Sequence, residues 1–165
     1  QQVMTTDQGS QAQSEYAGVK YYGPVVRQVL RATGLDVEQR SLTVKQVLFS
    51  SSVQHGEGSG GRRVFENALK ALGYPPNAPN ATDPADAALI RAVYAERRRG
   101  NGMAHFPSST SAVRQSVVNR FHNEEADALR SLEQEVSAAQ ETQPTMEPTD
   151  NAAATKTVTP TSNAQ

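Results

Sequence analysis

The sequence predicts an all-α protein, a compact bundle of about five helices with polar, disordered ends. In five separate segments, apolar residues recur three and four positions apart, which is the spacing of one helix face. Glycine and proline stand where helices end and begin, and no segment gives a convincing strand pattern. No repeat of fixed period is visible, which argues against a solenoid.

Composition indicates one folded domain between two polar tails. Only 36% of the 165 residues are hydrophobic, so polar segments must dilute an ordinary core. Residues 1–14 and 139–165 are rich in Gln, Ser, Thr and Pro. They cannot bury enough apolar surface to offset roughly 1–2 kcal/mol of backbone entropy per residue. We therefore expect the helical domain at 15–138. Since the chain does not begin with Met, we also expect a processed or partial product.

Charge and cysteine content exclude several classes of protein. The 16 basic and 17 acidic residues give a net charge of −1, which provides no global attraction to nucleic acid or anionic membrane. The chain has no cysteine, so a disulfide framework or a thiolate metal site is impossible. No run of about 18 apolar residues occurs, and the first residues lack the features of a signal peptide. We expect no membrane span.

The first two predicted helices have clear boundaries. Pro24 suits the first turn of a helix and Gly34 suits the position after its end. The apolar face of this helix consists of Val25, Val26, Val29 and Leu30. Ser41 is a candidate N-cap for a second helix that ends before Gly56, although its β-branched residues would also permit a strand.

Two further helices flank a proline-rich loop. The segment 62–73 has one apolar face and Gly73 as its stop. The residues of that face are Val64, Phe65, Ala68, Leu69 and Leu72. After a long loop at 74–84, Asp83 is the expected cap of a helix that begins at Pro84. Its inward residues are expected to be Leu89, Ile90, Val93 and Tyr94.

The last predicted helix is long and runs from about Ser109 to Ala138, after a turn through Gly100 and Gly102. Its expected apolar stripe consists of Val113, Val117, Phe121, Leu129, Leu132 and Val136. Beyond Glu125 the helix becomes mostly charged, so we expect that end to project from the body.

The glycine-rich segment "SSSVQHGEGSGGRRVF" (50–65) is the first candidate site. It lacks the Lys-Ser or Lys-Thr pair of a phosphate-binding loop, which argues against a nucleotide site. Glu57 precedes a helix, whose dipole favours an ionised carboxylate that can act as a base or nucleophile, and His55 is a further catalytic candidate. The alternative is a hinge at Gly58–Gly61, with His55 hydrogen-bonded to backbone.

Arginines are concentrated in the second candidate site. The segment from Arg91 to Arg120 contains six arginines and a single acidic residue, Glu96, which gives a local charge of +5. This pattern is typical of a solvated surface or of a groove for an anionic polymer, either nucleic acid or a carboxylate-bearing glycan strand. Few aromatic residues lie between the arginines, which argues against a single-stranded nucleic-acid platform.

Metal and serine-hydrolase sites find little support. His122 with Glu124 or Glu125 could lie on one helix face, but the chain has only three histidines and no second helical pair. No Gly-x-Ser-x-Gly elbow is present. We expect neither a metal nor a cofactor.

Five segments in order resemble a known family. They read "YYGPVV", "TGLDVEQRS", "SSSVQHGEGSGGRRVF", "LIRAVYAERR" and "SSTSAVRQSVVNRFHNEEADAL". Together, over about Tyr21 to Leu132, they are similar to the C-terminal portion of a chitosanase-like, lysozyme-superfamily peptidoglycan hydrolase domain. Such domains occur in phage virion proteins and secretion-system spike proteins. The resemblance implies a lysozyme-like helical fold and cleavage of peptidoglycan glycan strands.

The chain departs from that family at the catalytic positions. The family has proline where Glu57 stands, and its catalytic glutamate lies on an early helix before the "YYGPVV" match. Here only Asp7 and Glu15 precede Tyr16. Glycoside cleavage generally needs two carboxyl groups about 5–10 Å apart. The chain is therefore a fragment of a split enzyme, a degenerate copy, or a variant in which Glu57 and Glu96 took over catalysis.

These considerations lead to one expected function and two alternatives. The expected function is that of a phage virion protein related to peptidoglycan hydrolases, which acts at the host cell envelope and contacts glycan strands and other virion proteins. The alternatives are a non-catalytic structural or ejection protein docked on other virion chains, and a nucleic-acid-binding module. The candidate substrate-binding residues are Gln54, His55, Tyr94, Arg97 and Arg120.

Overall fold

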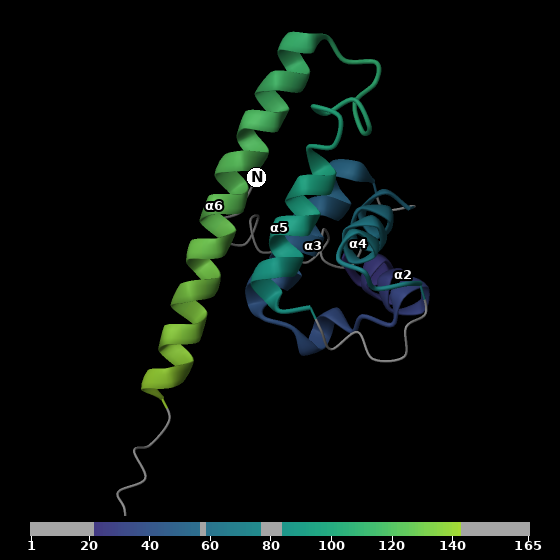
Figure 1. The fold of residues 1–165 in the computed structure, drawn as a ribbon. Coiled ribbons are helices and arrows are strands. Elements are labelled where there is room, and N and C mark those ends of the chain that lie inside the picture. The colour runs from purple at the N-terminus through teal and green to yellow at the C-terminus, as the bar shows by residue number, and fades with distance from the viewer. Residues whose placement is uncertain (1–21, 57–58, 77–83, 143–165) are drawn as a thin grey trace, which may run out of the picture.

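The computed structural model describes residues 22–56, 59–76 and 84–142. Within these ranges the chain forms five α-helices, one short 3-10 helix and no strand, which confirms the predicted all-α bundle (Figure 1). The elements are α2 (Gly23–Thr33), η2 (Val37–Gln39), α3 (Leu42–His55), α4 (Gly60–Ala71), α5 (Asp86–Arg97) and α6 (Ser111–Glu141). None of the helices in these ranges is both long and apolar enough to cross a membrane. The predicted tail at 1–14 and most of the tail at 139–165 lie outside the described residues.

Helix α4 lies at the centre of the bundle and packs against α2, α3 and α5. Helix α6 lies along α3 and α5 on one side of this group (Figure 1). Each of the five helices contributes at least one apolar side chain with no exposed surface or almost none. Examples of these side chains are Val29, Leu48, Phe65, Leu89, Ile90 and Phe121.

Two predicted helix boundaries are confirmed. Gly34 ends α2 in the left-handed conformation (φ 78°), and its N–H donates to the Leu30 carbonyl at 2.8 Å. Glycine adopts this conformation without steric cost. Ser41 caps α3, because its hydroxyl accepts a hydrogen bond from the Val44 N–H at 3.2 Å.

The short helix η2 and its contribution to the core were not predicted. Leu35 and Val37 are both 0% exposed and extend the core between α2 and α3. The Asp36 carboxylate accepts from the Glu38 N–H at 3.0 Å and holds the turn. A three-residue element is too short to show helical periodicity, so the sequence pattern does not reveal it.

Helix α4 begins two residues earlier than predicted. Its first turn contains Gly60 and Gly61, which belong to the hinge that is one alternative for this segment. A Cβ atom on Gly60 would lie 1.8 Å from the His55 carbonyl oxygen, and one on Gly61 would lie 2.9 Å from Ser52 Cα. The hinge interpretation is therefore wrong for these two glycines. They allow the backbones of α3 and α4 to approach closely.

Helix α5 begins at Asp86 rather than at Pro84. The Asp86 carboxylate binds Arg40 Nε at 3.1 Å and accepts from the Ser41 N–H at 3.0 Å, and Arg40 also donates to the Pro84 carbonyl. These contacts hold the chain in a non-helical conformation until residue 85. The predicted cap, Asp83, lies outside the described residues.

Helix α6 begins at Ser111, after the N-cap Thr110, and continues three residues beyond its predicted end. Val118 and Phe121 are its only fully buried residues, whereas Val113, predicted to face inward, is 51% exposed. The reason is that the preceding loop packs on another face of the first turns. A Cβ on Gly102 would lie 3.5 Å from Val118 Cγ2.

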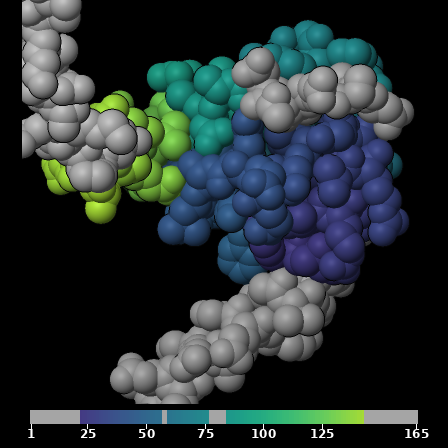
Figure 2. Space-filling view, turned by 90° about the horizontal axis from the view of Figure 1, so that it is seen from below, coloured from purple at the N-terminus to yellow at the C-terminus, as the bar shows by residue number. Residues whose placement is uncertain are grey.

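The last turns of α6, beyond Glu135, project from the bundle. Figures 1 and 2 show its yellow-green end standing to one side of the rounded body formed by the other helices. Leu129 and Leu132 still pack against the core, but Val136, also predicted to face inward, is 50% exposed. The charged composition beyond Glu125 predicts this projection, although its apolar stripe ends one turn earlier than expected.

Candidate functional site

Two of the hollows in the described part of the chain are lined by residues from more than one helix. The first, which we call the histidine pocket, has a volume of about 440 Å³ and lies between the end of α3, the start of α4 and the loop before α6. Its lining residues are Gln54, His55, Gly60, Arg63, Asn67, Arg99, Ala104, His105 and Phe106. The second, the α3–α6 cleft, has a volume of about 240 Å³.

Two imidazole rings lie side by side in the histidine pocket. The ring centroids of His55 and His105 are 4.8 Å apart, and Phe106 and Phe121 lie 5.7 and 6.3 Å from His55. Burial, and to a smaller extent the positive charges of neighbouring side chains, lower the pKa of His55 to about 3. His55 is therefore neutral near pH 7 and can both donate and accept one hydrogen bond.

The Glu96 carboxylate lies beneath this pocket and is 8% exposed. It accepts hydrogen bonds from Asn67 Nδ2 at 2.9 Å and from Arg99 Nε at 2.8 Å. His105 Nε2 lies 3.3 Å from its Oε1 atom and 2.9 Å from its backbone oxygen. Groups from α4, from the end of α5 and from the following loop therefore surround this carboxylate. A substrate oxygen could reach it only after these contacts are broken.

Arg97 is fully buried between two aromatic rings. Its guanidinium carbon lies 4.0 Å from the Phe121 ring centroid and 4.8 Å from that of Tyr94. Its Nη1 atom is 3.2 Å from Glu124 Oε2, and its Nη2 atom is 3.5 Å from Ser50 Oγ. Because the Nη1 group lacks a well-aligned acceptor among the described residues, the contact with Glu124 is mainly a charge interaction.

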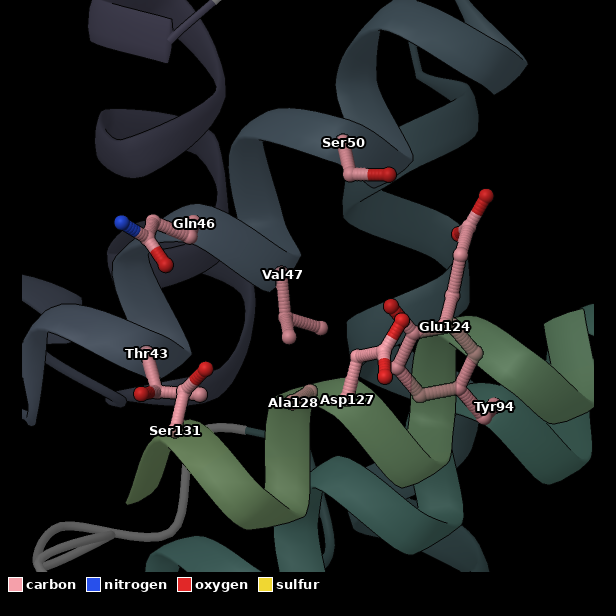
Figure 3. A pocket seen from close by; sticks show the side chains of 9 residues that line it. All are labelled: Thr43, Gln46, Val47, Ser50, Tyr94, Glu124, Asp127, Ala128 and Ser131. Carbon is pink, nitrogen blue, oxygen red and sulfur yellow. The ribbon is translucent and has the colours of Figure 1, made fainter. Parts of the chain in front are cut away.

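Two carboxylates of α6 face α3 across the α3–α6 cleft (Figure 3). Glu124 is paired with Arg97 and with Arg120 Nε at 3.1 Å, and Asp127 is paired with Arg130 Nη1 at 2.8 Å. The other residues that line the cleft are Thr43, Gln46, Val47, Ser50, Tyr94, Ala128 and Ser131. Because the two carboxylates are one turn apart on the same helix, they line one wall of the cleft instead of flanking a ligand.

The arginine-rich stretch does not form a continuous free basic groove. Arg98 Nη1 lies 2.6 Å from Glu125 Oε2, and Arg120 donates to Gln54 Oε1 at 2.5 Å as well as pairing with Glu124. Arg99 is bonded to Glu96, as described above. Carboxylates of α5 and α6 therefore pair with four of the six arginines that the sequence places in this stretch.

The structure separates the predicted site residues. Gln54 and His55 line the histidine pocket, Tyr94 lines the α3–α6 cleft, and Arg120 is half exposed between the two. Arg97 is inaccessible in the core. Glu57 lies outside the described residues, so its predicted catalytic role and its distance from Glu96 stay predictions.

Sequence reasoning missed Asn67 and His105, which complete the histidine pocket, and it placed Arg63 and Arg99 in two separate candidate sites. His105 lies 50 residues from its ring partner His55 in the sequence, and no short motif links them. The closely packed glycines before Arg63 were the one available signal. Within the described ranges, no group of three His, Cys, Asp or Glu side chains could hold a metal ion, and His122 is exposed.

Comparisons with known proteins give one result. The family described as "Type VI secretion system spike protein VgrG3-like, C-terminal" matches residues 2–125. No curated protein and no solved structure matches the chain significantly. The matched region includes α2 to α5, both histidines of the pocket and the first half of α6. The chain therefore belongs to the family of VgrG3-like spike protein C-terminal regions of type VI secretion systems.

Proposed function

We propose that this chain is a non-catalytic docking domain of a secretion spike or a related phage particle, where it attaches to neighbouring particle proteins. Its membership of a spike protein family supports this location. The single observation that carries the proposal is the state of its carboxylates: those that line or underlie the two hollows are all paired with arginines in the described ranges.

Paired carboxylates are poor proton donors for glycoside cleavage. The general acid of a glycosidase keeps its proton because it lies in an apolar, weakly solvated place without a cationic partner. Glu96 has Arg99 and two further polar neighbours, and Glu124 has two arginines. In both cases these partners occupy the carboxylate, so a glycosidic oxygen could approach it only after a contact is broken.

The exposed face of the second half of α6, which includes its projecting end, is the surface that we assign to docking. Val136 is 50% exposed there, and polar side chains of both charge signs surround it, as at the rim of many protein interfaces. The polar residues of this surface include Arg130, Glu133, Gln134, Ser137 and Glu141. A helix that stands away from its own body can contact a neighbour without disturbing the core.

A cross-linking experiment tests the docking role. A photo-reactive amino acid at position 136 in the assembled particle should cross-link to another particle protein. The same residue at position 42, where Leu42 is 59% exposed on the body, serves as the matched control. Equal cross-linking from both positions, or none from position 136, would contradict the assignment.

A hydrolysis assay tests the absence of catalysis. Purified peptidoglycan incubated with the chain should release no new reducing ends above the buffer control. The variants Glu57→Gln and Glu96→Gln should behave like the unaltered chain. Release that disappears in either variant would overturn the non-catalytic proposal.

The second candidate is a cell-wall hydrolase, as the resemblance to chitosanase-like and lysozyme-superfamily domains implies. One observation favours it: Gln54 and His55, which belong to the glycine-rich motif of that resemblance, line a polar pocket directly above Glu96. In this case Glu57 and Glu96 would be the carboxyl pair, and Glu96 would have to exchange its present contacts for the substrate. The hydrolysis assay distinguishes this candidate from the docking domain.

A further inference from the structure

Helix α3 carries apolar side chains on two opposite faces. One face is buried in the core. On the outward face Leu42 is 59% exposed, Val53 is 51% exposed, and Phe49 between them is partly exposed. A helix that is apolar on both faces is typically covered on both faces. The outward face of α3 therefore has the composition of a contact surface.

The residues of this outward face follow the spacing of a coiled-coil seam. Leu42, Gln46, Phe49 and Val53 lie four, three and four positions apart, as the a and d positions of a heptad do. They form one line, which we call the α3 ridge, over about 16 Å or three turns of the helix. A single polar residue in such a seam, here Gln46, can fix the register of two paired helices.

The α3 ridge is complementary to a second copy of itself. The spacing of its residues is the same in both directions along the helix. A two-fold axis that pairs two antiparallel α3 helices therefore places Leu42 of each copy opposite Val53 of the other. The same axis places Gln46 opposite Phe49 in the middle of the ridge. Such a match of one surface with itself is the requirement of a symmetric dimer interface.

The charges of α3 favour a second copy over a charged partner. The helix contains no acidic residue, and the ammonium of its one lysine, Lys45, lies 3.5 Å from Glu38 of η2. Because the ridge itself is uncharged, two copies bring no like charges together. A partner with a charged face would have to desolvate its charges against uncharged side chains, which costs free energy.

The α3–α6 cleft lies next to the ridge. Gln46 belongs to the ridge and also lines this cleft, together with Ser50 of the same helix (Figure 3). On the α6 side, the small residues Ala128 and Ser131 line the cleft. The cleft therefore leaves space beside the ridge for large side chains of a second α3 helix, such as Phe49.

We propose that two copies of this chain associate through the α3 ridge, as an antiparallel pair of α3 helices related by a two-fold axis. One ridge of three turns buries less than the roughly 800 Å² per partner of a standard interface, so the dissociation constant should exceed about 1 µM. The pairing uses no residue of α6 as a contact anchor, so it can fail without affecting the docking role. A photo-reactive residue at position 42 would give a product of twice the chain's mass, which distinguishes it from a product with another protein.

Cysteine cross-linking tests the arrangement, because the chain contains no native cysteine. A mixture of Leu42→Cys and Val53→Cys chains should form a disulfide-linked dimer under mild oxidation. Each variant alone should form far less, because its two thiols would lie at opposite ends of the pair, about 16 Å apart. Val113→Cys, at an exposed position of α6, replaces Leu42→Cys in the matched control. Equal cross-linking in mixed and single samples, or none in the mixture, would overturn the antiparallel pair.

Sedimentation equilibrium of the whole chain measures the association itself. The mean mass should rise from that of one chain towards that of two between about 1 µM and 1 mM. Val53→Glu should weaken the association about tenfold or more, because it places a carboxylate against Leu42 of the other copy without a partner. Val53 is half exposed in the single chain, so the variant should keep its fold.

Val113→Glu is the matched control and should leave the association unchanged. A chain that stays monomeric up to 1 mM would mean that the ridge serves a different partner, and this result would overturn the proposal. The same conclusion would follow if Val53→Glu and Val113→Glu chains associated equally well.

Discussion

Arg97 connects three helices although it carries a charge in the core. It belongs to α5, contacts Phe121 and Glu124 on α6, and approaches Ser50 on α3. Such a residue stabilises the fold only while its partners compensate for the water it has lost. Its removal leaves a cavity between two rings and deprives Glu124 of one of its two arginines.

Arg97→Ala should therefore lower the free energy of unfolding by about 3 kcal/mol. Arg97→Met, which keeps the volume between the rings, should lose less than half as much. Urea denaturation followed by circular dichroism measures both. Arg91→Ala, at an exposed position of the same helix, should change stability by less than about 0.5 kcal/mol. A small effect of Arg97→Ala would mean that the guanidinium contributes little to packing.

His55 makes stability depend on pH. Its pKa is lowered to about 3 in the folded chain, first by burial and then by His105 and two arginines, whereas an unfolded histidine titrates near pH 6.5. Between these values the unfolded state binds the additional proton. Stability is therefore full above about pH 6.5 and falls as the pH decreases towards 3.

His55→Gln removes this proton uptake. Between pH 6.5 and 4 the free energy of unfolding should decrease less steeply in the variant than in the unaltered chain, by up to one proton's contribution. Urea titrations at several pH values provide the comparison. Parallel pH profiles would show that the His55 ring is not protected from protonation.

At the scale of elements, the junction of α3 and α4 depends on two glycines. Gly60→Ala places a methyl group 1.8 Å from the His55 carbonyl oxygen, so the start of α4 must move. We expect a loss of about 3 kcal/mol in unfolding free energy. Gly61→Ala, with a nearest approach of 2.9 Å to Ser52, should cost less. Thermal unfolding ranks the two, and the reverse order would contradict this account of the junction.

The projecting part of α6 should contribute little to stability. A chain that ends at Ser137 should lose less than about 1 kcal/mol, because the residues removed make no described contact with the body. Glu135→Ala should cost about 1 kcal/mol, because the Glu135 carboxylate accepts from the N–H and the hydroxyl of Thr43 at 2.8 and 2.7 Å. A large loss on truncation would show that this end packs against the body.

At the scale of the whole molecule, hydrogen exchange should follow the arrangement of the helices. Amides of α4 and α5, which have neighbours on several sides, should exchange only on global unfolding. Amides of α6 beyond Val136 should exchange fastest among the helical residues, since that end lies in solvent. Uniform protection along α6 would indicate a partner on its projecting half.

The sequence predicts local features of this fold better than the contacts between distant residues. Gly34 and Ser41 act within one turn of the chain, so their roles follow from the nearby residues. The exposure of Val113 depends on how the loop at Gly102 packs, and this information is absent from the helix itself. The spacing of apolar residues predicted α6 and most of its buried face, which includes Val117, Phe121, Leu129 and Leu132, but not the exposure of Val113 and Val136.

In the candidate site, too, the sequence predicts residues of a local motif better than residues that tertiary packing brings together. The sequence predicted Gln54 and His55 as site residues, because they belong to one glycine-rich motif. His105 and Asn67 reach the same pocket only through the packing of α4 against α5. The arginine-rich stretch predicted a basic groove, but pairing with α6 carboxylates depends on a helix that begins later in the chain. The resemblance correctly indicated the C-terminal part of a secretion spike protein, whereas its chitosanase-like and lysozyme-like part stays a prediction.

The ion pairs along α6 determine how the molecule should respond to mechanical load. This helix of 31 residues is about 46 Å long. Its contacts with the other helices are made by Phe121, Glu124 and Glu135, which lie at successive positions along its length. Tension applied at its far end, at right angles to its axis, would break these contacts one after another. Tension along the axis would strain all of them together. A particle that pulls on this chain could thus release it easily in one direction and keep it attached in the other.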